Sequence, residues 1–309
     1  MDYSISRTPA LLFHKIQMAE RRSFTAEQAE AVTNRLGLRI ERIIPTRRGS
    51  VIITATDTER NVLKIADLKC AETEQLIAPS RSEGIENEAR TLCILESGIA
   101  PALRTFERDE RLHIVFSAIE YINGFAPDYR IMRGLDQCLG STIHLLQSIA
   151  KIHAKKIIHG DVQPENILWL SGDHRQVRLI DFELSKRTEE PVISKPGLYH
   201  FLSPEAAEQV LNTGKCIIDI AEETFATAAT TLALLKGSKT PIEYTATTTR
   251  KESRLQEIMK AGYDEKGVVP DAIDLARRIV HVLLSPANNR PKTPLELLDF
   301  LKPCLKVNP

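Results

Sequence analysis

The amino-acid sequence predicts an α+β fold of two lobes, a small antiparallel β-sheet lobe with one main helix and a larger, mostly helical lobe. Two observations lead to this prediction. Between residues 38 and 65, three short apolar runs alternate with polar turns, which is typical of an antiparallel meander, and two further strand-like runs follow before residue 120. After residue 121, apolar residues recur every three or four positions, which is typical of packed helices. The 309 residues suffice for one such two-lobed unit with a substantial core.

The small lobe is expected over residues 37–120, after an N-terminal helical extension over residues 1–36. In that extension, Thr25 and Gln28 have the spacing of a capping box, so a helix is expected to begin there. The main helix of the lobe is expected over residues 82–96, where apolar side chains recur at helical spacing. Strands are expected at five apolar runs, residues 38–44, 50–54, 61–65, 102–106 and 112–119.

The larger lobe is expected over residues 121–309. An amphipathic helix is expected over residues 141–153, followed by two short strands at residues 166–170 and 177–182. The Ala- and Thr-rich segment at residues 217–236 is expected to form a buried central helix. The two lobes are expected to be parts of one domain over residues 37–309.

Charge and cysteine content exclude several classes of protein. The 41 Lys and Arg residues balance 41 Asp and Glu residues, so there is no basic surplus to favour binding to nucleic acid or to an anionic membrane. The five cysteines lie far apart without C-x-x-C spacing, which indicates reduced thiols rather than a disulfide framework or a zinc site. No apolar stretch is long enough to cross a bilayer. We therefore expect a cytoplasmic protein, and no pattern indicates an oligomer.

A cluster of polar residues opens the larger lobe. Asp161 is followed five residues later by Asn166, and Asp181 follows on the next hairpin. Two carboxylates and an amide that converge at the ends of short strands suit phosphoryl transfer. One carboxylate can orient an attacking hydroxyl, while the other carboxylate and the amide hold Mg²⁺ on the nucleotide phosphates. A single aspartate in a loop is usually a turn or a cap, but the joint pattern favours a site.

The segment from His159 to Glu183 resembles the catalytic loop and the metal-binding loop of the protein-kinase-like fold. The resemblance covers nearly the whole chain after residue 38. It implies a two-lobed protein-kinase-like fold in which Asp161 accepts the proton of the hydroxyl. It also implies that Asn166 and Asp181 hold Mg²⁺ and that ATP is the phosphate donor.

Residues of the small lobe fit the same family. Lys64 resembles the strand lysine that pairs with the α- and β-phosphates of ATP, and Glu88 resembles the helix glutamate that positions this lysine. The resemblance also implies a hinge for adenine. In this hinge Ile119 is the gatekeeper, and the carbonyl of Glu120 and the amide of Ile122 bond the purine. The site is expected in the cleft between the lobes.

Two distant residues indicate a branch of the family. Glu205, in Ser-Pro-Glu, resembles the glutamate of the family's Ala-Pro-Glu, and Arg290 resembles the arginine that pairs with it. Protein-kinase-like chains have this pair, whereas small-molecule phosphotransferases with an H-G-D loop usually lack it. The pair therefore favours a protein or peptide acceptor.

The loop that covers the phosphates departs from the family pattern. Residues 46–50 contain one glycine, Gly49, where several are expected, and Arg47 or Arg48 is an alternative phosphate contact to a solvated pair. Gly160 replaces the arginine that reads a phosphorylated activation loop. Activity is therefore expected not to need such phosphorylation.

Two further departures concern the chemistry itself. Gln163 replaces the lysine of the catalytic loop, and it can bond the transferring phosphate without adding charge. Glu183 replaces the glycine of the metal loop, and two alternatives stay open: it supplies a Mg²⁺ oxygen, or it faces solvent. Such changes resemble atypical bacterial kinases and small-molecule phosphotransferases of the choline- and aminoglycoside-kinase-like type.

Several residues are expected to act only through the framework. A carboxylate at the start of the central helix is expected to bond the backbone of the catalytic loop. Spacing favours Glu223 for this role, while residue type favours Asp219. His153, His159 and Trp169 are expected in the core, with His159 packed against the phenylalanine of the metal loop.

The leading hypothesis is an ATP- and Mg²⁺-dependent phosphotransferase that moves the γ-phosphate to a hydroxyl, foremost Ser or Thr of a protein or peptide. Two alternatives stay open, a pseudokinase that serves as a binding module and a kinase of small molecules. The chain retains all five residues that the chemistry needs, which favours catalysis. These are Lys64, Glu88, Asp161, Asn166 and Asp181. No nucleic acid or membrane partner is expected.

Overall fold

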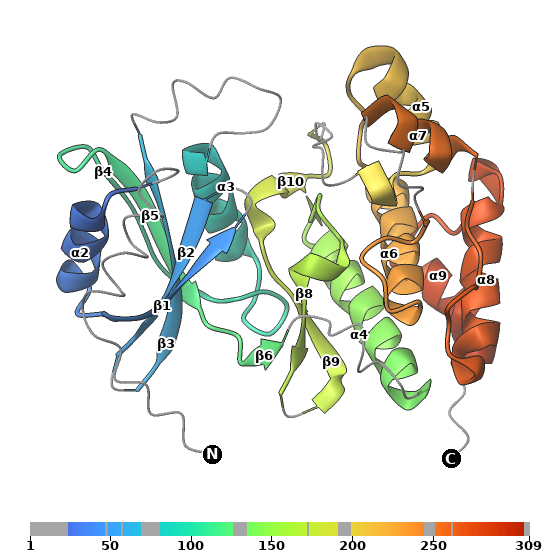
Figure 1. The fold of residues 1–309 in the computed structure, drawn as a ribbon, viewed down its shortest axis with the longest axis horizontal. Helices are drawn as coiled ribbons and strands as arrows, with labels where there is room; N and C mark the ends of the chain where they lie inside the picture. The colour runs from blue at the N-terminus through green and yellow to red at the C-terminus, as the bar shows by residue number, and fades with distance from the viewer. Residues whose placement is uncertain are drawn as a thin grey trace. The chain divides into compact units, whose positions relative to one another are not determined.

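The structure is a computed structural model, and it describes most of the chain (Figure 1). The described residues are 24–46, 49–56, 58–68, 81–125, 135–171, 173–190, 199–243, 251–260 and 262–305. The chain divides into two compact units. The small unit comprises Met1–Cys93 and Pro101–Tyr121, and the large unit comprises Ile94–Ala100 and Ile122–Pro309.

The small unit contains a five-stranded antiparallel sheet with the strand order β1-β2-β3-β5-β4. Each strand coincides with one of the apolar runs in the sequence. The first three strands pair in chain order, which confirms the meander predicted there, whereas β3 pairs next with β5 and not with β4. The strands are β1 (Arg39–Thr46), β2 (Gly49–Ala55), β3 (Arg60–Asp67), β4 (Leu103–Asp109) and β5 (Ile114–Glu120).

The first hairpin is tighter than predicted. Strand β1 does not end at residue 44 but continues through Pro45 to Thr46, which pairs with Gly49 at the start of β2. Proline lacks an N–H group, and β1 tolerates it because it is an edge strand with one unpaired side. Only Arg47 and Arg48 remain between the strands, and both lie outside the described residues. The expectation that they contact phosphate therefore stays a prediction.

Helices α2 (Ala26–Arg35) and α3 (Arg81–Ile94) cover opposite faces of the sheet (Figure 1). Side chains of a strand alternate between its faces. On one face, Leu63 and Ile65 share a core with α2, and on the other, Ala66 packs with Ile85 of α3. The helix expected at residues 82–96 is thus confirmed.

The helix of the N-terminal extension begins with the predicted capping box. The Gln28 N–H donates to Thr25 Oγ1 at 3.1 Å, and the Thr25 N–H donates to Gln28 Oε1 at 2.8 Å. Phe24, Ala29 and Val32 are buried in the core that the helix shares with the sheet. In the described part of the extension, α2 therefore belongs to the small unit as a packed layer.

The large unit is mostly helical, with two small sheets of order β6-β8-β9 and β10-β7. Helix α6 is its centre, because every residue from Glu223 to Leu235 is buried. The helices are α4 (Leu135–Ala154), α5 (Pro204–Thr213), α6 (Ile220–Leu235), α7 (Lys251–Met259), α8 (Ile273–Leu284) and α9 (Pro294–Leu301). The strands are β6 (Gly124–Phe125), β7 (Ile157–Ile158), β8 (Ile167–Leu170), β9 (Asp173–Leu179) and β10 (Lys186–Arg187). Short 3₁₀ helices include η2 (Pro164–Asn166), η3 (Phe182–Leu184) and η4 (Tyr199–Phe201).

The core of the large unit contains the residues expected there. Trp169 is 1% exposed, and its ring stacks near Phe125 at 6.5 Å between centroids. The ring of His159 lies 4.5 Å from that of Phe182, as predicted. Helix α4 packs against both β9 and α6, which places the predicted amphipathic face in the interior.

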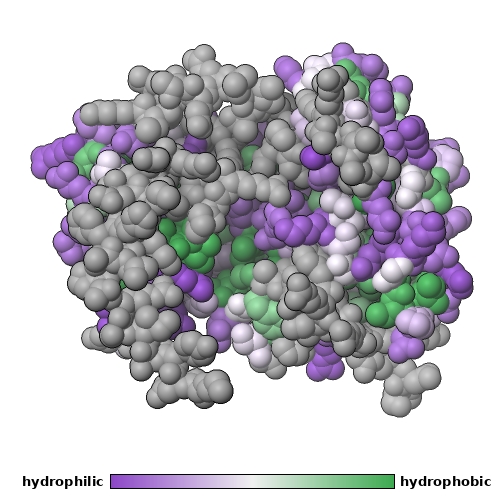
Figure 2. Space-filling model, in the orientation of Figure 1, coloured by the Kyte–Doolittle hydropathy of each residue, from purple (hydrophilic) through white to green (hydrophobic). Residues whose placement is uncertain are grey.

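The described surface of the face shown in Figure 2 is largely hydrophilic, with separate hydrophobic areas. The large hydrophobic residues that are exposed lie scattered along the chain, which is ordinary for a protein surface. They are Ile94, Phe106, Ile217, Met259, Leu284 and Leu295. Across the described residues, no helix is both long and apolar enough to cross a membrane.

Candidate active site

The small unit holds a buried ion pair between β3 and α3. The Lys64 Nζ lies 3.0 Å from Glu88 Oε1 and 2.8 Å from Oε2, and the two side chains are only 7% and 1% exposed. The sheet register explains the meeting, because Lys64 and Ala66 point to the same face, on which α3 packs. The loss of either partner of a buried ion pair is strongly destabilising, so the pair fixes the positions of both side chains.

The predicted hinge lies at the end of β5. Ile119 is 4% exposed and pairs with Val62, so its side chain is on the same face of the sheet as Lys64. The Glu120 side chain is bound locally, because its Oε2 accepts from the Ala102 N–H at 3.0 Å. Purine contacts by the carbonyl of Glu120 and the amide of Ile122 stay predictions.

In the large unit, the carboxylate of Asp161 is held by two amides. Gln163 Nε2 donates to Asp161 Oδ1 at 2.9 Å, and Asn166 Nδ2 donates to Oδ2 at 2.8 Å. The three side chains are 2% to 8% exposed. The sequence predicts Gln163 as a phosphate ligand, but the structure shows its amide hydrogen directed at Asp161. Gln163 therefore also fixes the orientation of the carboxylate.

The backbone brings Asp181 to the same loop. The Ile180 N–H donates to the Asn166 carbonyl at 3.0 Å, and the Ile180 carbonyl lies 3.2 Å from Nε2 of His159. Asp181 follows directly with a φ of 66°, a left-handed conformation that residues with a side chain seldom adopt. The two hairpin segments are thus bonded together immediately beside the residues expected to bind Mg²⁺.

The donor atoms at this place fit Mg²⁺. Nδ2 of Asn166 makes both of its bonds to Asp161, which leaves the amide oxygen for a cation. Asp181 adds a carboxylate, and Mg²⁺ prefers such oxygen ligands together with water and phosphate oxygens. Within the described ranges, no group of three His, Cys, Asp or Glu side chains could hold a metal ion without such added ligands.

The structure excludes one of the two alternatives for Glu183, exposure to solvent. Glu183 is 2% exposed, because the 3₁₀ turn η3 buries all three of its residues. It therefore does not face solvent. A Mg²⁺ oxygen from Glu183 stays a prediction.

The anchoring carboxylate is Glu223, as its spacing indicates. Its Oε1 accepts from the Gly160 N–H at 2.7 Å, and its Oε2 accepts from the His159 N–H at 3.2 Å and lies 2.6 Å from Nε2 of His153. Burial alone would raise the pKa of Glu223, but these partners lower it below its ordinary value. Asp219 instead caps α6 by accepting from the Glu222 N–H at 2.8 Å.

The backbone at Gly160 disfavours any side chain at this position. Its φ is 76°, and a Cβ atom at this position would lie 2.6 Å from the Leu184 carbonyl oxygen. The catalytic loop therefore approaches the metal loop so closely that only glycine fits.

The predicted pair of Glu205 and Arg290 is formed. Arg290 Nη1 lies 2.7 Å from Glu205 Oε2 and Nη2 lies 3.3 Å from Oε1. The guanidinium also donates to the Ser285 carbonyl at 2.7 Å and lies 4.9 Å from the centre of the Phe225 ring. Arg290 thereby connects the start of α5 with α6.

Comparison with known proteins agrees with this geometry. The sequence matches the family described as protein kinase domain over residues 50–309, which is most of the chain. The chain belongs to the protein kinase family. This confirms the resemblance of the sequence to protein kinases, and the two-lobed α+β fold is confirmed with it.

Relatives of this kinase chain include serine/threonine kinases. It is 28% identical to serine/threonine-protein kinase SBK1 of Danio rerio over 137 residues, which are 40% of this chain and 35% of the relative. It is 23% identical to calcium/calmodulin-dependent protein kinase type 1 of Caenorhabditis briggsae over 159 residues, 50% of this chain and 44% of the relative. The chain thus spans less than half the length of these two relatives.

A solved structure shares the fold of this kinase chain. The twitchin kinase region from C. elegans matches with a TM-score of 0.65 and 18% identity, and the match covers 88% of this chain and 46% of that one. At this identity the likeness concerns the fold alone.

The structure places the predicted site residues of the kinase chain in two groups. Lys64 and Glu88 meet in the small unit, and Asp161, Asn166 and the Ile180–Asp181 backbone meet in the large unit. Gly49 begins β2, and the cleft between the units stays a prediction. Sequence reasoning expects His153 in the core but does not predict its contact with Glu223.

Proposed function

We propose that this protein is an ATP- and Mg²⁺-dependent phosphotransferase that moves the γ-phosphate of ATP to a Ser or Thr hydroxyl of a protein or peptide. The observation that supports the proposal most is the ion pair of Lys64 and Glu88, because a buried charged pair is costly unless it serves a purpose. Its geometry suits a lysine held ready for nucleotide phosphates.

The transfer itself needs no covalent intermediate on the enzyme. The acceptor hydroxyl donates its proton to Asp161 while its oxygen bonds to the γ-phosphorus. The bond from that phosphorus to the bridging oxygen breaks, and ADP leaves with the electron pair. The two amide donors on Asp161 fix its carboxylate in one orientation, so positioning supplies much of the rate.

Asn166 and Asp181 would hold Mg²⁺, with Glu183 as a candidate for a further oxygen. Bound Mg²⁺ would neutralise part of the negative charge on the nucleotide phosphates. On the side of the chain, Asn166 contributes an amide oxygen whose direction is set by its own bonds to Asp161.

A protein or peptide acceptor is supported by the pair of Glu205 and Arg290 and by the relatives named as serine/threonine kinases. Gln163 and Glu183 resemble small-molecule phosphotransferases and atypical bacterial kinases, which keeps a small hydroxylated acceptor as the alternative. The buried bond between Gln163 and Asp161 favours neither class.

Activity is proposed not to depend on phosphorylation of the activation loop. Gly160 carries no cation to read a phosphate, and a larger residue would meet the Leu184 carbonyl. An acidic mimic at Thr188, such as Thr188→Glu, should therefore leave turnover within about twofold of the starting protein, on the scale of surface charges. A strong rise in turnover would contradict this part of the proposal.

The proposal is tested in three steps. A thermal shift with Mg²⁺ and ATP measures nucleotide binding. Mass spectrometry of candidate peptides and metabolites then looks for the mass of an added phosphate. Asp161→Ala should abolish transfer but leave nucleotide binding, while Asp181→Ala should weaken the metal-dependent part of that binding.

The outcomes distinguish the three candidate functions. ATP turnover no higher than that of Asp181→Asn would identify a pseudokinase. Absence of any Mg²⁺-nucleotide binding would reject the proposal as a whole. Phosphate found on metabolites alone would identify a small-molecule kinase.

A further inference from the structure

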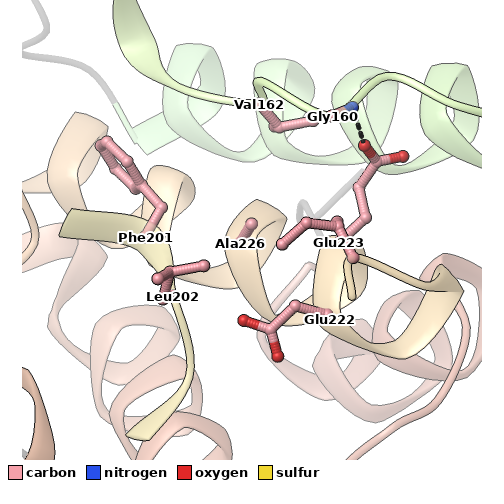
Figure 3. A pocket seen from close by; sticks show the side chains of 8 residues that line it. Gly160, Val162, Phe201, Leu202, Glu222, Glu223 and Ala226 are labelled. Atoms are coloured by element: carbon pink, nitrogen blue, oxygen red, sulfur yellow. Dashed lines mark hydrogen bonds between the residues drawn. The ribbon is translucent and has the colours of Figure 1, made fainter. Parts of the chain in front are cut away.

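A small cavity lies directly behind the catalytic loop (Figure 3). Gly160 and Val162, the two neighbours of Asp161, line one side of it, and Phe201 and Leu202 line another. The first turn of α6 adds consecutive carboxylates, Glu222 and Glu223. Two chain segments that are far apart in sequence therefore meet over one turn of helix.

The two carboxylates serve different segments. Glu223 reaches Gly160, while the Glu222 carboxylate points away from it in Figure 3. Glu222 Oε1 instead accepts from the Ser203 N–H at 2.7 Å. Ser203 is the N-cap of α5, since its hydroxyl accepts from the Ala206 N–H at 3.1 Å. Glu222 thus fixes the point at which the segment with η4 ends and α5 begins.

We propose that Glu222 is a positioning residue for phosphate transfer, which holds the segment Tyr199–Ser203 against the back of the catalytic loop. Together, Glu222 and Glu223 attach both walls of the cavity to the same helical turn. Gly160 and Val162 flank Asp161 in the chain. A shift of Phe201 or Leu202 on the opposite wall would therefore change the packing behind Asp161 and the position of its carboxylate. The proposal rests on the proposed function, in which Asp161 accepts the proton.

The hydrogen bond from the Ser203 N–H to Glu222 is sensitive to pH, because its surroundings shift the ionisation of Glu222. The pKa of Glu222 is raised to about 7, with burial as the largest cause, and the neighbouring charge of Asp219 acts in the same direction. The bond from Ser203 and the charge of Arg290 act in the opposite direction. Arg290 is itself paired with Glu205, the charged residue of the first turn of α5.

The sign of the effect follows from the ionisation of Glu222. Above pH 7 the carboxylate is ionised, and an ionised acceptor makes a stronger hydrogen bond than a neutral one. Below pH 7 the carboxyl group is neutral and holds the Ser203 N–H less firmly. The segment Tyr199–Ser203 is therefore held more tightly as pH rises through 7.

Hydrogen exchange on the full chain tests the hold without need of an acceptor. After correction for intrinsic rates, the amides around Ser203 should exchange about fivefold more slowly at pH 8 than at pH 6, the factor expected between charged and neutral hydrogen bonds. Glu222→Gln keeps a neutral acceptor, so this pH dependence should vanish. Glu222→Ala should exchange fast at both pH values.

Asp219→Asn is the control variant that changes only the charge beside Glu222, because asparagine still caps a helix but carries no charge. It should keep the pH dependence and move its midpoint to lower pH, since the Asp219 charge raises the pKa of Glu222. A midpoint that does not move, or a Glu222→Gln profile that equals that of the starting protein, would overturn the proposal.

Transfer of phosphate from ATP to a degenerate Ser/Thr peptide library supplies the kinetic readout. Glu222→Gln should remove the step in kcat near pH 7, and the KM for ATP should stay within about twofold because Lys64 lies elsewhere. A parallel rise in the KM for ATP and fall in kcat would indicate a merely structural residue and contradict the inference. If the starting protein transfers no phosphate while the exchange data behave as expected, the proposed function is wrong, but Glu222 still fixes the segment Tyr199–Ser203.

Discussion

Replacement of Glu223 by alanine removes the acceptor of three donors at once. The backbone N–H groups of His159 and Gly160 and the imidazole of His153 all meet this one carboxylate. In the variant Glu223→Ala, both N–H groups stay buried without a partner. Asp219→Ala, four positions earlier, removes only the cap of the same helix.

The magnitudes follow from these contacts. A buried N–H left unsatisfied costs about 1–3 kcal/mol and a lost hydrogen bond about 1 kcal/mol, so two such groups and the lost bond to His153 give a loss of about 3–7 kcal/mol in the free energy of unfolding. Loss of a helix cap costs about 1 kcal/mol. A domain has a free energy of unfolding of roughly 5–15 kcal/mol, so Glu223→Ala should remove a large part of it and Asp219→Ala a small part.

Urea denaturation of the two variants measures the difference, with Glu223→Gln as an intermediate case that keeps the size of the side chain. The deficit of Glu223→Ala should shrink in acid. Because the pKa of Glu223 is lowered in the folded chain, its contribution is present above the ordinary value of 4.5 and is lost as pH falls through the folded pKa. Equal losses in the two alanine variants at pH 7 would refute Glu223 as the anchor.

Three further predictions concern other parts of the fold. Glu88→Gln removes the carboxylate that lies 2.8 Å from Lys64 in a buried ion pair, so the free energy of unfolding should fall by about 3–5 kcal/mol, and the thermal shift produced by Mg²⁺ and ATP should decrease. Gly160→Ala should lose about 1–3 kcal/mol from its left-handed backbone, with more from the close carbonyl, as measured by urea denaturation. Burial raises the pKa of Cys138 to about 11, so at pH 8 iodoacetamide should modify the exposed Cys93 and leave Cys138 unmodified in mass spectra of the folded chain.

Much of the fold could be predicted because the apolar pattern records burial directly. The strands and the two helices of the small unit follow from it, but boundaries depend on contacts that a pattern does not contain. Helix α4 begins at Leu135 rather than at the predicted residue 141, so it includes Gly140. In the fold it gives room to Arg175, whose Cβ would lie 2.5 Å from an added Cβ atom.

Contacts within one short segment could be predicted better than contacts between distant segments. Asp161 and Asn166 lie in a short segment whose spacing alone indicates their meeting. Glu222 gives no such signal, since a glutamate in the first turn of a helix is usually a solvated residue that favours the helix dipole. Its role depends on Ser203, which is distant in sequence and approaches only in the fold.

The packing of α2 has a practical consequence for anyone who would shorten this protein. The family match begins at residue 50, inside β2, so a protein trimmed to that match would lack both α2 and β1. The sheet face with Leu63 and Phe116 would then lose its cover, and β2 would become an open edge. Exposed apolar strands of this kind are templates for aggregation. Soluble expression should accordingly require a start upstream of Phe24, well before the first residue that sequence comparison would suggest.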